Sequence, residues 1–349
     1  MKVLMISGDP GVLNPNSDAG KRMEEYRQTL GTLDILVCRG NIFSFITGFF
    51  RGVKIIRKNK PEVITAQDME HSLFAWIFSR LFKVPWQMQI HTDIFSPYFW
   101  QESFKNKIRV VLAKFLLPRA SCIRVMSERI KESITWRLGR QVAAELFVTV
   151  LPIFVDTEKI KNTPIKTNLH KKYPGRFIIL MASRITREKN IVMALEAMRG
   201  LTQNDTRTNA EKVLLLIIGD GPEKEHLRRM AYSLKLDESV VFESATSDLA
   251  SYYKTCDLFL LTSDYEGYGR TLIEAAAIKA KIISSDVGIV PEILELDCIF
   301  KIGDKDGLAE KINAALAGQL KPPKPVIFQT KQEYLRLYKN NLEQCQKIF

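Results

Sequence analysis

The sequence predicts an α/β protein with two Rossmann-like, doubly wound parallel-sheet domains that face a cleft. Three observations support this fold class. The chain has 349 residues, which is long for a single hydrophobic core. Short β-branched runs alternate with longer stretches of helical periodicity, which is typical of parallel sheets covered on both faces. The alternation pauses near residue 162 and then restarts, which indicates two similar domains.

The first domain is expected to run from residue 1 to residue 165. Strands are predicted where four to six residues rich in Val and Ile occur together, and helices where apolar residues recur every three or four positions. The predicted strands are 3–7, 35–38, 63–66, 86–90, 121–126 and 147–151. The predicted helices are 19–30, 44–58, 72–82, 105–116 and 128–138.

The second domain is expected at residues 166–330. A Pro- and Lys-bearing segment at 162–176, which spans the boundary, has no period and is typical of a linker. Its predicted strands are 177–182, 213–218, 240–242, 258–262 and 281–285, and its helices begin near Asn190, Pro222 and Gly269. The stretch K-P-P-K-P leads to a final helix within 331–349, which we expect to return to the first domain.

Composition restricts the possible partners and compartments. The net charge is +12, and residues 1–160 carry 23 lysines and arginines against 15 aspartates and glutamates, which favours anionic partners. The five cysteines are scattered, so neither a zinc site nor a disulfide framework is indicated, and a reducing cytoplasmic location is expected. The N-terminal apolar run is too short for a signal peptide, and no run is long enough to span a membrane.

Ligands of open α/β sheets bind at the carboxyl ends of strands, so functional residues are expected in the loops after strands. The loop after the first strand lacks G-x-G-x-x-G, but Gly20 could let a phosphate approach a helix N-terminus. The alternative is a plain surface loop. His91 and Asp93 follow the fourth strand, where they could bond sugar hydroxyls or move protons. The alternative for His91 is a structural histidine.

Arg184 and Lys189 flank the turn after the first strand of the second domain, with Arg187 between them. Two cations at this position suit a diphosphate and could stabilise charge on a leaving phosphate. A solvated basic turn is the alternative. The loop after the next strand is expected to be a structural turn, because its sequence is I-I-G-D-G-P-E.

The stretch D-Y-E-G-Y-G-R-T-L-I-E places Glu266 in a glycine-rich loop and Glu274 in the first turns of a helix. A glycine turn and a helix N-terminus can form an anion-binding site that needs no metal. Two carboxylates could bind hydroxyls, act as a glycosidase pair, or simply be acidic residues near a helix start.

These motifs together resemble the family 4 glycosyltransferases, which use nucleotide sugars and have the GT-B fold. The matching motifs are R-x4-K at Arg184 and Lys189, the G-D-G-P loop, E-x7-E from Glu266 to Glu274, and D-V-G-I-V-P-E from Asp286. The resemblance is loose in the first domain. It implies a retaining hexosyltransferase that uses a UDP- or GDP-sugar and requires neither metal nor cofactor.

The resemblance also implies roles for single residues. Arg184 and Lys189 would hold the donor diphosphate, Glu274 the ribose and Glu266 the donor sugar. His91 would lie beside the reacting centre. The loop and helix start would contribute further donor contacts, through Gly20, Gly267, Tyr268, Gly269, Arg270 and Thr271. Lys279 and Ile289 depart from the family pattern, which has glycine at both positions.

The acceptor implied by the resemblance is a glycan or a lipid-linked molecule in the synthesis of cell-surface polysaccharide or glycolipid. Residues 43–58 combine apolar and basic side chains, so this helix either lies on an anionic membrane or packs on the sheet. Residues 94–100, followed by basic residues to Lys114, form a second membrane candidate. Together with the positive charge of the first half, these segments favour a peripheral location on the inner face of the cell membrane.

Other functions remain open within the same fold. A sugar-nucleotide epimerase, a phosphorylase or a non-catalytic nucleotide-binding protein would share these motifs. A dinucleotide-dependent oxidoreductase would require a glycine fingerprint that neither half contains. A nucleic-acid-binding protein is disfavoured because no basic-aromatic groove motif is present.

Overall fold

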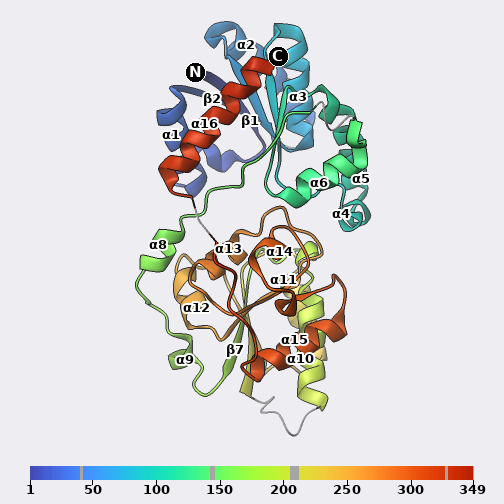
Figure 1. Cartoon of the computed structure of the whole chain (residues 1–349), viewed down its shortest axis with the longest axis vertical. Helices are drawn as coiled ribbons and strands as arrows, with labels where there is room; N and C mark the ends of the chain where they lie inside the picture. The colour runs from blue at the N-terminus through green and yellow to red at the C-terminus, as the bar shows by residue number, and fades with distance from the viewer. Residues whose placement is uncertain (40–41, 142–145, 205–211, 327–328, 349) are drawn as a thin grey trace. The chain divides into compact units, whose positions relative to one another are not determined.

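The computed structural model describes residues 1–39, 42–141, 146–204, 212–326 and 329–348. The chain divides into two compact units, which are considered separately. Unit 1 comprises Met1–Phe154 and Gln329–Phe349, and unit 2 comprises Val155–Phe328. Each unit contains one six-stranded sheet in which all described strand pairs are parallel (Figure 1). The predicted α/β fold class with two parallel sheets is confirmed.

The sheet of unit 1 has the strand order β2-β1-β3-β4-β5-β6. Its strands are β1 (Lys2–Ser7), β2 (Thr32–Val37), β3 (Val63–Gln67), β4 (Trp86–Ile90), β5 (Cys122–Val125) and β6 (Val148–Val150). Its helices are η1 (Pro10–Leu13), α1 (Asp18–Leu30), α2 (Ile42–Asn59), α3 (Asp68–Phe82), α4 (Pro97–Glu102), α5 (Phe104–Leu116), η2 (Leu117–Arg119), α6 (Glu128–Leu138) and α16 (Lys331–Ile348).

The sheet of unit 2 has the order β12-β11-β10-β7-β8-β9. Its strands are β7 (Phe177–Ala182), β8 (Val213–Ile218), β9 (Val240–Glu243), β10 (Leu258–Leu261), β11 (Ile282–Ser285) and β12 (Ile299–Phe300). Its helices are α8 (Thr157–Asn162), α9 (Leu169–Lys172), η3 (Arg187–Lys189), α10 (Ile191–Asn204), α11 (Lys224–Ser233), α12 (Leu249–Thr255), α13 (Arg270–Ala277), α14 (Val290–Ile293), η5 (Leu296–Cys298) and α15 (Lys305–Leu316).

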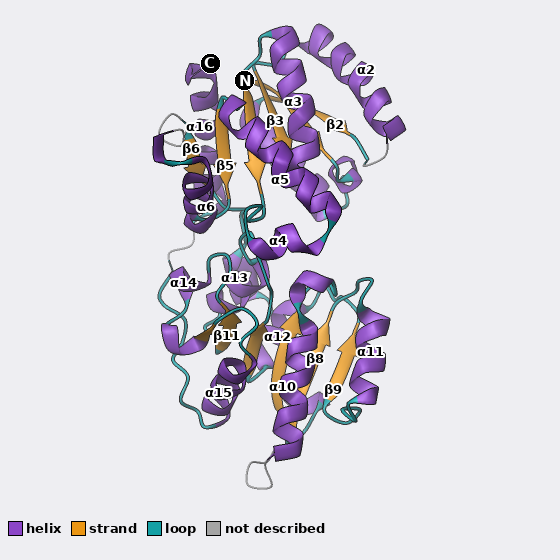
Figure 2. Ribbon diagram, turned by 90° about the vertical axis from the view of Figure 1, so that its right-hand side faces the viewer, coloured by secondary structure: helices purple, strands orange, loops and turns teal. Residues whose placement is uncertain are grey.

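The direction of the crossovers decides which helices cover each face of the unit 1 sheet. The chain moves one way from β1 to β2 and the other way from β2 through β3 to β5. Because such crossovers are right-handed, α1 lies on one face (Figure 1), while α2, α3 and α5 lie on the other (Figure 2). Side chains alternate accordingly, and Val3 and Met5 join the core beneath α1 and α16.

Helix α16 packs against unit 1, beside α1 and over β3, β4 and β5. Its Tyr334 hydroxyl accepts a hydrogen bond from Arg124 Nη2 at 2.9 Å and lies 2.8 Å from the Tyr26 hydroxyl. Arg124 is almost fully buried, and its Nε donates to Leu151 O at 2.8 Å. A buried guanidinium is tolerated only when its donors are satisfied, so this network ties α16 to the sheet.

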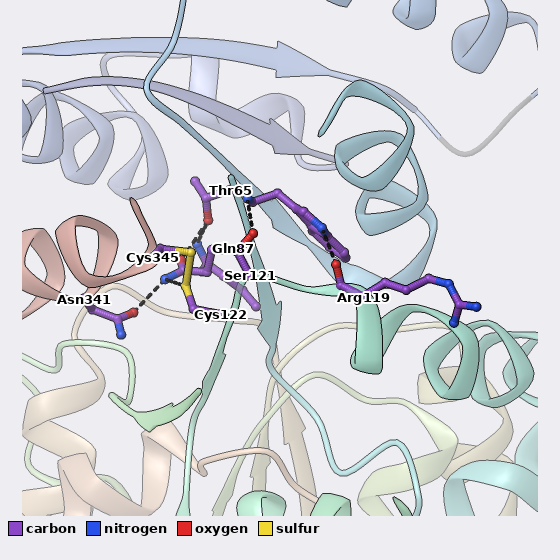
Figure 3. The surroundings of a disulfide bond; sticks show 9 residues. Thr65, Gln87, Arg119, Ser121, Cys122, Asn341 and Cys345 are labelled. Atoms are coloured by element: carbon purple, nitrogen blue, oxygen red, sulfur yellow. Dashed lines mark hydrogen bonds between the residues drawn. A yellow bond between two sulfur atoms is a disulfide. The ribbon is translucent and has the colours of Figure 1, made fainter. Parts of the chain in front are cut away.

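A disulfide between Cys122 of β5 and Cys345 of α16 corrects the prediction from cysteine spacing (Figure 3). The two cysteines are separated by 223 positions in the sequence, and their Cα atoms are 5.3 Å apart. Next to them, Gln87 Nε2 donates to Asn341 Oδ1 at 2.6 Å. Scattered cysteines in this chain are therefore no basis for assigning a reducing compartment.

The segment 162–176 is not the free linker that its composition indicated. It contains α9, and Leu169 is fully buried in the core of unit 2. The Lys166 amide donates to Ser251 Oγ at 2.9 Å, and the Leu169 amide donates to Thr255 Oγ1 at 3.2 Å. This segment is therefore part of unit 2.

Helix α2 packs on the sheet layer, which was one of the two alternatives, and its other side is exposed. One side packs on the sheet layer through Gly48, Gly52 and Ile56, and a Cβ atom at Gly52 would overlap the Phe78 ring. On the other side, Phe43 and Phe50 are exposed. The helix therefore contributes to the core and also leaves an apolar surface in solvent.

Candidate functional site

The main candidate site lies at the carboxyl edge of the unit 2 sheet. Strands β11, β10 and β7 are neighbours in that sheet, so the loops that follow them emerge side by side. These loops contain residues 183–190, 262–269 and 286–289. Most of the residues predicted to bind the donor lie in them, in agreement with the rule that open α/β sheets bind ligands at this edge.

An ion pair joins two of these loops. Lys189 Nζ lies 2.5 Å from Glu266 Oε1, and the two side chains are only 13% and 14% exposed. Ser263 Oγ donates a second hydrogen bond to Glu266 Oε1 at 2.8 Å. The sequence predicted both charged residues as site residues, but not their direct pairing.

Hydrogen bonds around the ion pair fix the conformation of both loops. Thr262 Oγ1 donates to Lys189 O at 2.8 Å, and the Asp264 amide donates to Glu188 O at 2.9 Å. Asn190 Nδ2 donates to Asp264 Oδ1 at 2.8 Å. Asn190 has a φ of 45°, a left-handed conformation that asparagine tolerates better than most residues. Lys189 is therefore held in place by its own backbone as well as by Glu266.

Glycines allow neighbouring loops to approach this region. A Cβ atom at Gly219 would overlap Ser183 O, and one at Gly221 would overlap Ile185 O. These two glycines of the G-D-G-P loop therefore serve backbone packing, as the sequence indicated. A Cβ atom at Gly288 would lie 3.1 Å from Glu266 Cβ, so the loop after β11 also contacts the carboxylate residue.

Glu274 lies on α13, and Tyr253 of α12 positions its carboxylate. The buried Tyr253 hydroxyl donates to Glu274 Oε2 at 2.9 Å, and Arg270 Nη2 lies 3.8 Å from Glu274 Oε1. Burial raises the pKa of the Glu274 carboxyl, whereas the Tyr253 hydrogen bond and the Arg270 charge act in the opposite direction. The sequence missed Tyr253 because nothing in the spacing of α12 relates it to α13.

The turn before α13 contains the remaining residues predicted to bind the donor. Gly269 has a φ of 86°, which glycine adopts without steric cost, and it immediately precedes Arg270. A helix start leaves its first backbone N–H groups without intrahelical acceptors. Gly267, Tyr268 and Thr271 belong to this same turn and helix start.

Arg184 differs from Lys189 because its side chain is 79% exposed. Its Nη2 lies 3.6 Å from Glu188 Oε1, a weak contact for an exposed pair. The predicted pair of cations therefore consists of one fixed ammonium and one solvent-accessible guanidinium on the same loop.

In unit 1, His91 follows β4 at the carboxyl edge of that sheet. Its Nε2 atom is buried and has no hydrogen-bond partner among the described residues. Burial, followed by the positive charges of Arg124 and Arg22, lowers the pKa of His91 to about 3. The imidazole is therefore neutral near pH 7 and can donate or accept a hydrogen bond, but it carries no charge.

Two other residues singled out in unit 1 are engaged in local structure. Asp93 Oδ1 accepts hydrogen bonds from Ser133 Oγ at 2.8 Å and from the Phe95 amide at 3.2 Å. The Gly20 amide donates to Ser17 Oγ, and a Cβ atom at Gly20 would overlap Asn14 O. Loop packing thus accounts for Gly20 without a ligand.

The described residues contain neither a cluster of metal-ligating side chains nor a membrane-spanning helix. Over the described ranges, no group of three or more His, Cys, Asp or Glu side chains could hold a metal ion. Over the same ranges, no helix has the length and apolar character needed to cross a bilayer.

Two protein-family models match the chain. The model described as glycosyl transferases group 1 matches residues 163–332, and the model described as glycosyl transferase 4-like domain matches residues 22–150. Together they cover most of both units.

Individual relatives agree with these models. The capsular polysaccharide biosynthesis glycosyltransferase CapM of Staphylococcus aureus is 23% identical over 306 residues, which are 85% of this chain and 78% of CapM. The alpha-monoglucosyldiacylglycerol synthase of Streptococcus pneumoniae is 26% identical over 247 residues, which are 68% of this chain and 54% of the synthase. Among solved structures, HepE of Anabaena in complex with UDP-glucose has a TM-score of 0.70 at 20% identity and covers 100% of this chain and 95% of HepE. That likeness shows the fold.

The lowered pKa of His91 predicts a pH-dependent loss of stability. Unfolded histidine binds a proton below a pH of about 6.5, but folded His91 does so only near pH 3, so stability decreases as pH falls between these values. Between pH 7 and pH 5, wild type should lose about 1–2 kcal/mol more unfolding free energy than His91→Asn. Urea unfolding of both proteins at the two pH values measures this difference, and equal losses would contradict the pKa assignment.

Proposed function

The chain belongs to the family 4 glycosyltransferases of the GT-B fold, and on that premise we propose a retaining hexosyltransferase that uses a UDP- or GDP-sugar. The acceptor is a glycan or a lipid-linked molecule, in the synthesis of cell-surface polysaccharide or glycolipid. The observation that supports this most strongly is the cluster at the carboxyl edge of unit 2. There, Lys189, Glu266 and Glu274 lie on loops and a helix fixed by their own hydrogen bonds.

In the proposed donor complex, the diphosphate binds Lys189 and Arg184. The Lys189 ammonium is positioned before the ligand arrives, and Arg184 is accessible enough to move onto the phosphates. The helix start at Gly269–Thr271 supports the same negative charge. Glu274 accepts hydrogen bonds from the ribose, and Glu266 accepts them from the sugar.

Transfer then breaks the bond between the anomeric carbon and the diphosphate oxygen. An acceptor hydroxyl forms the new bond on the same face, and its proton passes to the leaving phosphate oxygen. Lys189 and Arg184 stabilise the charge that develops on the diphosphate, which is the task a metal would otherwise perform. The reaction in this proposal requires neither metal nor cofactor. His91 is proposed to act in the transfer as a neutral hydrogen-bonding group.

The proposed location is cytoplasmic and peripheral to the inner face of the cell membrane. Two observations support the membrane association. The first half of the chain is the more basic, and apolar residues of α2 are exposed. The names of two relatives refer to capsular polysaccharide biosynthesis and to the synthesis of alpha-monoglucosyldiacylglycerol, and these names apply to those proteins.

A panel of UDP-, GDP- and ADP-sugars tests the proposed activity most directly. We expect turnover with at least one donor when an acceptor is present, and NMR of the product should show the same anomeric configuration as the donor. Inversion would refute the proposed mechanism. Interconversion of sugars without an acceptor would favour an epimerase, and dependence on orthophosphate would favour a phosphorylase. Binding without turnover would favour a non-catalytic nucleotide-binding protein.

Lys189→Ala tests the charge-stabilising role. Loss of one fixed group that stabilises developing charge typically lowers kcat by about a hundredfold or more, so kcat/KM should fall at least that far. Lys235→Ala, at an exposed position after α11, is the matched control and should retain activity. Thermal unfolding of both variants separates loss of activity from loss of fold. Near-normal turnover of folded Lys189→Ala would remove this residue from the proposed mechanism.

A further inference from the structure

Exposed apolar side chains are concentrated on one group of helices in unit 1. Of the fifteen large exposed apolar residues among the described part of the chain, eleven lie on α2 to α6. They are Phe43, Ile46, Phe50, Leu81, Tyr98, Trp100, Phe104, Ile108, Val111, Phe115 and Trp136. Scattered exposed residues are ordinary, but a concentration of this kind marks an interaction surface.

The most regular part of this surface is on α5. Phe104, Ile108, Val111 and Phe115 are 77%, 54%, 61% and 40% exposed. Their spacing of four, three and four places them on one face of the helix, and they are called the α5 stripe below. The opposite face of α5 is buried and also largely apolar. The helix therefore has a second apolar face that unit 1 does not cover.

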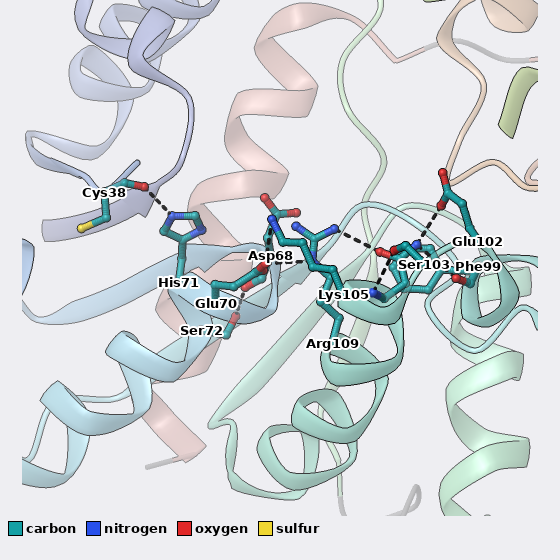
Figure 4. A network of polar contacts seen from close by, with 11 residues as sticks. Cys38, Asp68, Glu70, His71, Ser72, Phe99, Glu102, Ser103, Lys105 and Arg109 are labelled. Atoms are coloured by element: carbon teal, nitrogen blue, oxygen red, sulfur yellow. Dashed lines mark hydrogen bonds and ion pairs between the residues drawn. The ribbon is translucent and has the colours of Figure 1, made fainter. Parts of the chain in front are cut away.

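Polar contacts fix the orientation of α5, as Figure 4 shows. Arg109 Nε donates to Glu70 Oε1 of α3 at 2.8 Å. Buried Asn106 Nδ2 donates to Phe99 O at 3.0 Å, and Ser103 Oγ accepts from the Asn106 amide at 3.1 Å. With its inner face fixed in this way, α5 cannot rotate to bury the stripe.

The charged residues of α5 and α2 are all positive, and Glu70 of α3 pairs with Lys105 and Arg109 of α5. Helix α5 carries four lysines and arginines and no aspartate or glutamate, and α2 likewise carries four and none. Lys107 and Lys114 are exposed beside the stripe, and the Lys107 ammonium lies 5.9 Å from the Trp100 ring centroid. An apolar stripe flanked by lysines, with tryptophan nearby, is the composition of helices that lie in a membrane interface.

We infer that the α5 stripe, together with the exposed Phe43, Ile46 and Phe50 of α2, docks on an anionic phospholipid bilayer. The inference deepens the proposed membrane association and rests on it. Charge complementarity favours this occupant over a second copy of the chain. A symmetric dimer through this face would oppose the same cations to each other, with no carboxylate on α2 or α5 to offset them.

The topology places the beginning of this apolar surface at the carboxyl edge of the unit 1 sheet. In a parallel sheet, the helix after a strand begins at the carboxyl edge. Phe43 and Phe104 are at the beginning of α2 and α5, and Trp100 precedes α5, so the apolar side chains begin at that edge. His91 also follows β4 there. A docked bilayer would therefore present a lipid-linked acceptor on the side of unit 1 that holds the candidate histidine.

Vesicle flotation of the full chain tests this inference. The probes are phosphatidylcholine vesicles with and without phosphatidylglycerol. Wild type should float with the anionic vesicles and much less with the neutral ones. The double variant Ile108→Ser/Val111→Ser should lower the partition coefficient at least about tenfold. Lys107→Gln/Lys114→Gln should lower it by about fivefold for each charge removed, on anionic vesicles only.

The matched control is Tyr232→Ser/Leu296→Ser, which removes two apolar side chains of unit 2 that are 73% and 83% exposed. It should float like wild type. Equal flotation of the α5 double variant, or absence of wild-type flotation, would overturn the inference. A wild-type dimer that dissociates in the α5 double variant would overturn it in favour of a second copy. Transfer to a soluble acceptor, assayed in parallel, separates failure of docking from failure of the proposed function.

Discussion

The ion pair between Lys189 and Glu266 is the interaction on which the candidate donor site depends. Both side chains are largely removed from solvent, so each charge would be costly without the other. The pair joins the loops after β7 and β10, and hydrogen bonds from Thr262 and Asp264 hold the same two loops together. In the proposed complex, a diphosphate shares the ammonium with Glu266. The cation therefore does not have to be reoriented when the donor binds.

The sequence was most informative where local pattern and chemistry coincide. Parallel strands that are buried on both faces form continuous apolar runs, so both sheets and the loops at their carboxyl edges could be predicted. The positions of Arg184, Lys189, Glu266 and Glu274 followed from motif spacing. Contacts between distant segments could not be predicted in this way. Tyr253 contacts Glu274 from another helix, and Cys122 pairs with Cys345 across 223 positions, so no local periodicity relates the partners.

The helices of unit 1 show a different limit of sequence patterns. Apolar periodicity indicates that a helix has a hydrophobic face, but not what covers it. In α5 both faces are apolar, and only the structure shows that Asn106, Arg109 and the core contacts fix one of them inward. In α2, some residues pack in the core while other residues of the same helix are exposed. In the two proposals, the cations of unit 1 contact a membrane surface, whereas those of the unit 2 site contact the donor diphosphate.

The central claim is that the carboxyl edge of unit 2 binds a nucleoside diphosphate, with Glu274 as a ligand of the ribose. Calorimetric titration of the full chain with UDP, GDP and ADP measures this directly. At least one should bind saturably, and its Kd should rise about tenfold or more in Glu274→Gln, because the amide lacks the negative charge and offers one acceptor oxygen in place of two. Glu238→Gln, at an exposed position before β9, should bind like wild type. Failure of all three nucleotides to bind, or an unchanged Kd in Glu274→Gln, would contradict the account.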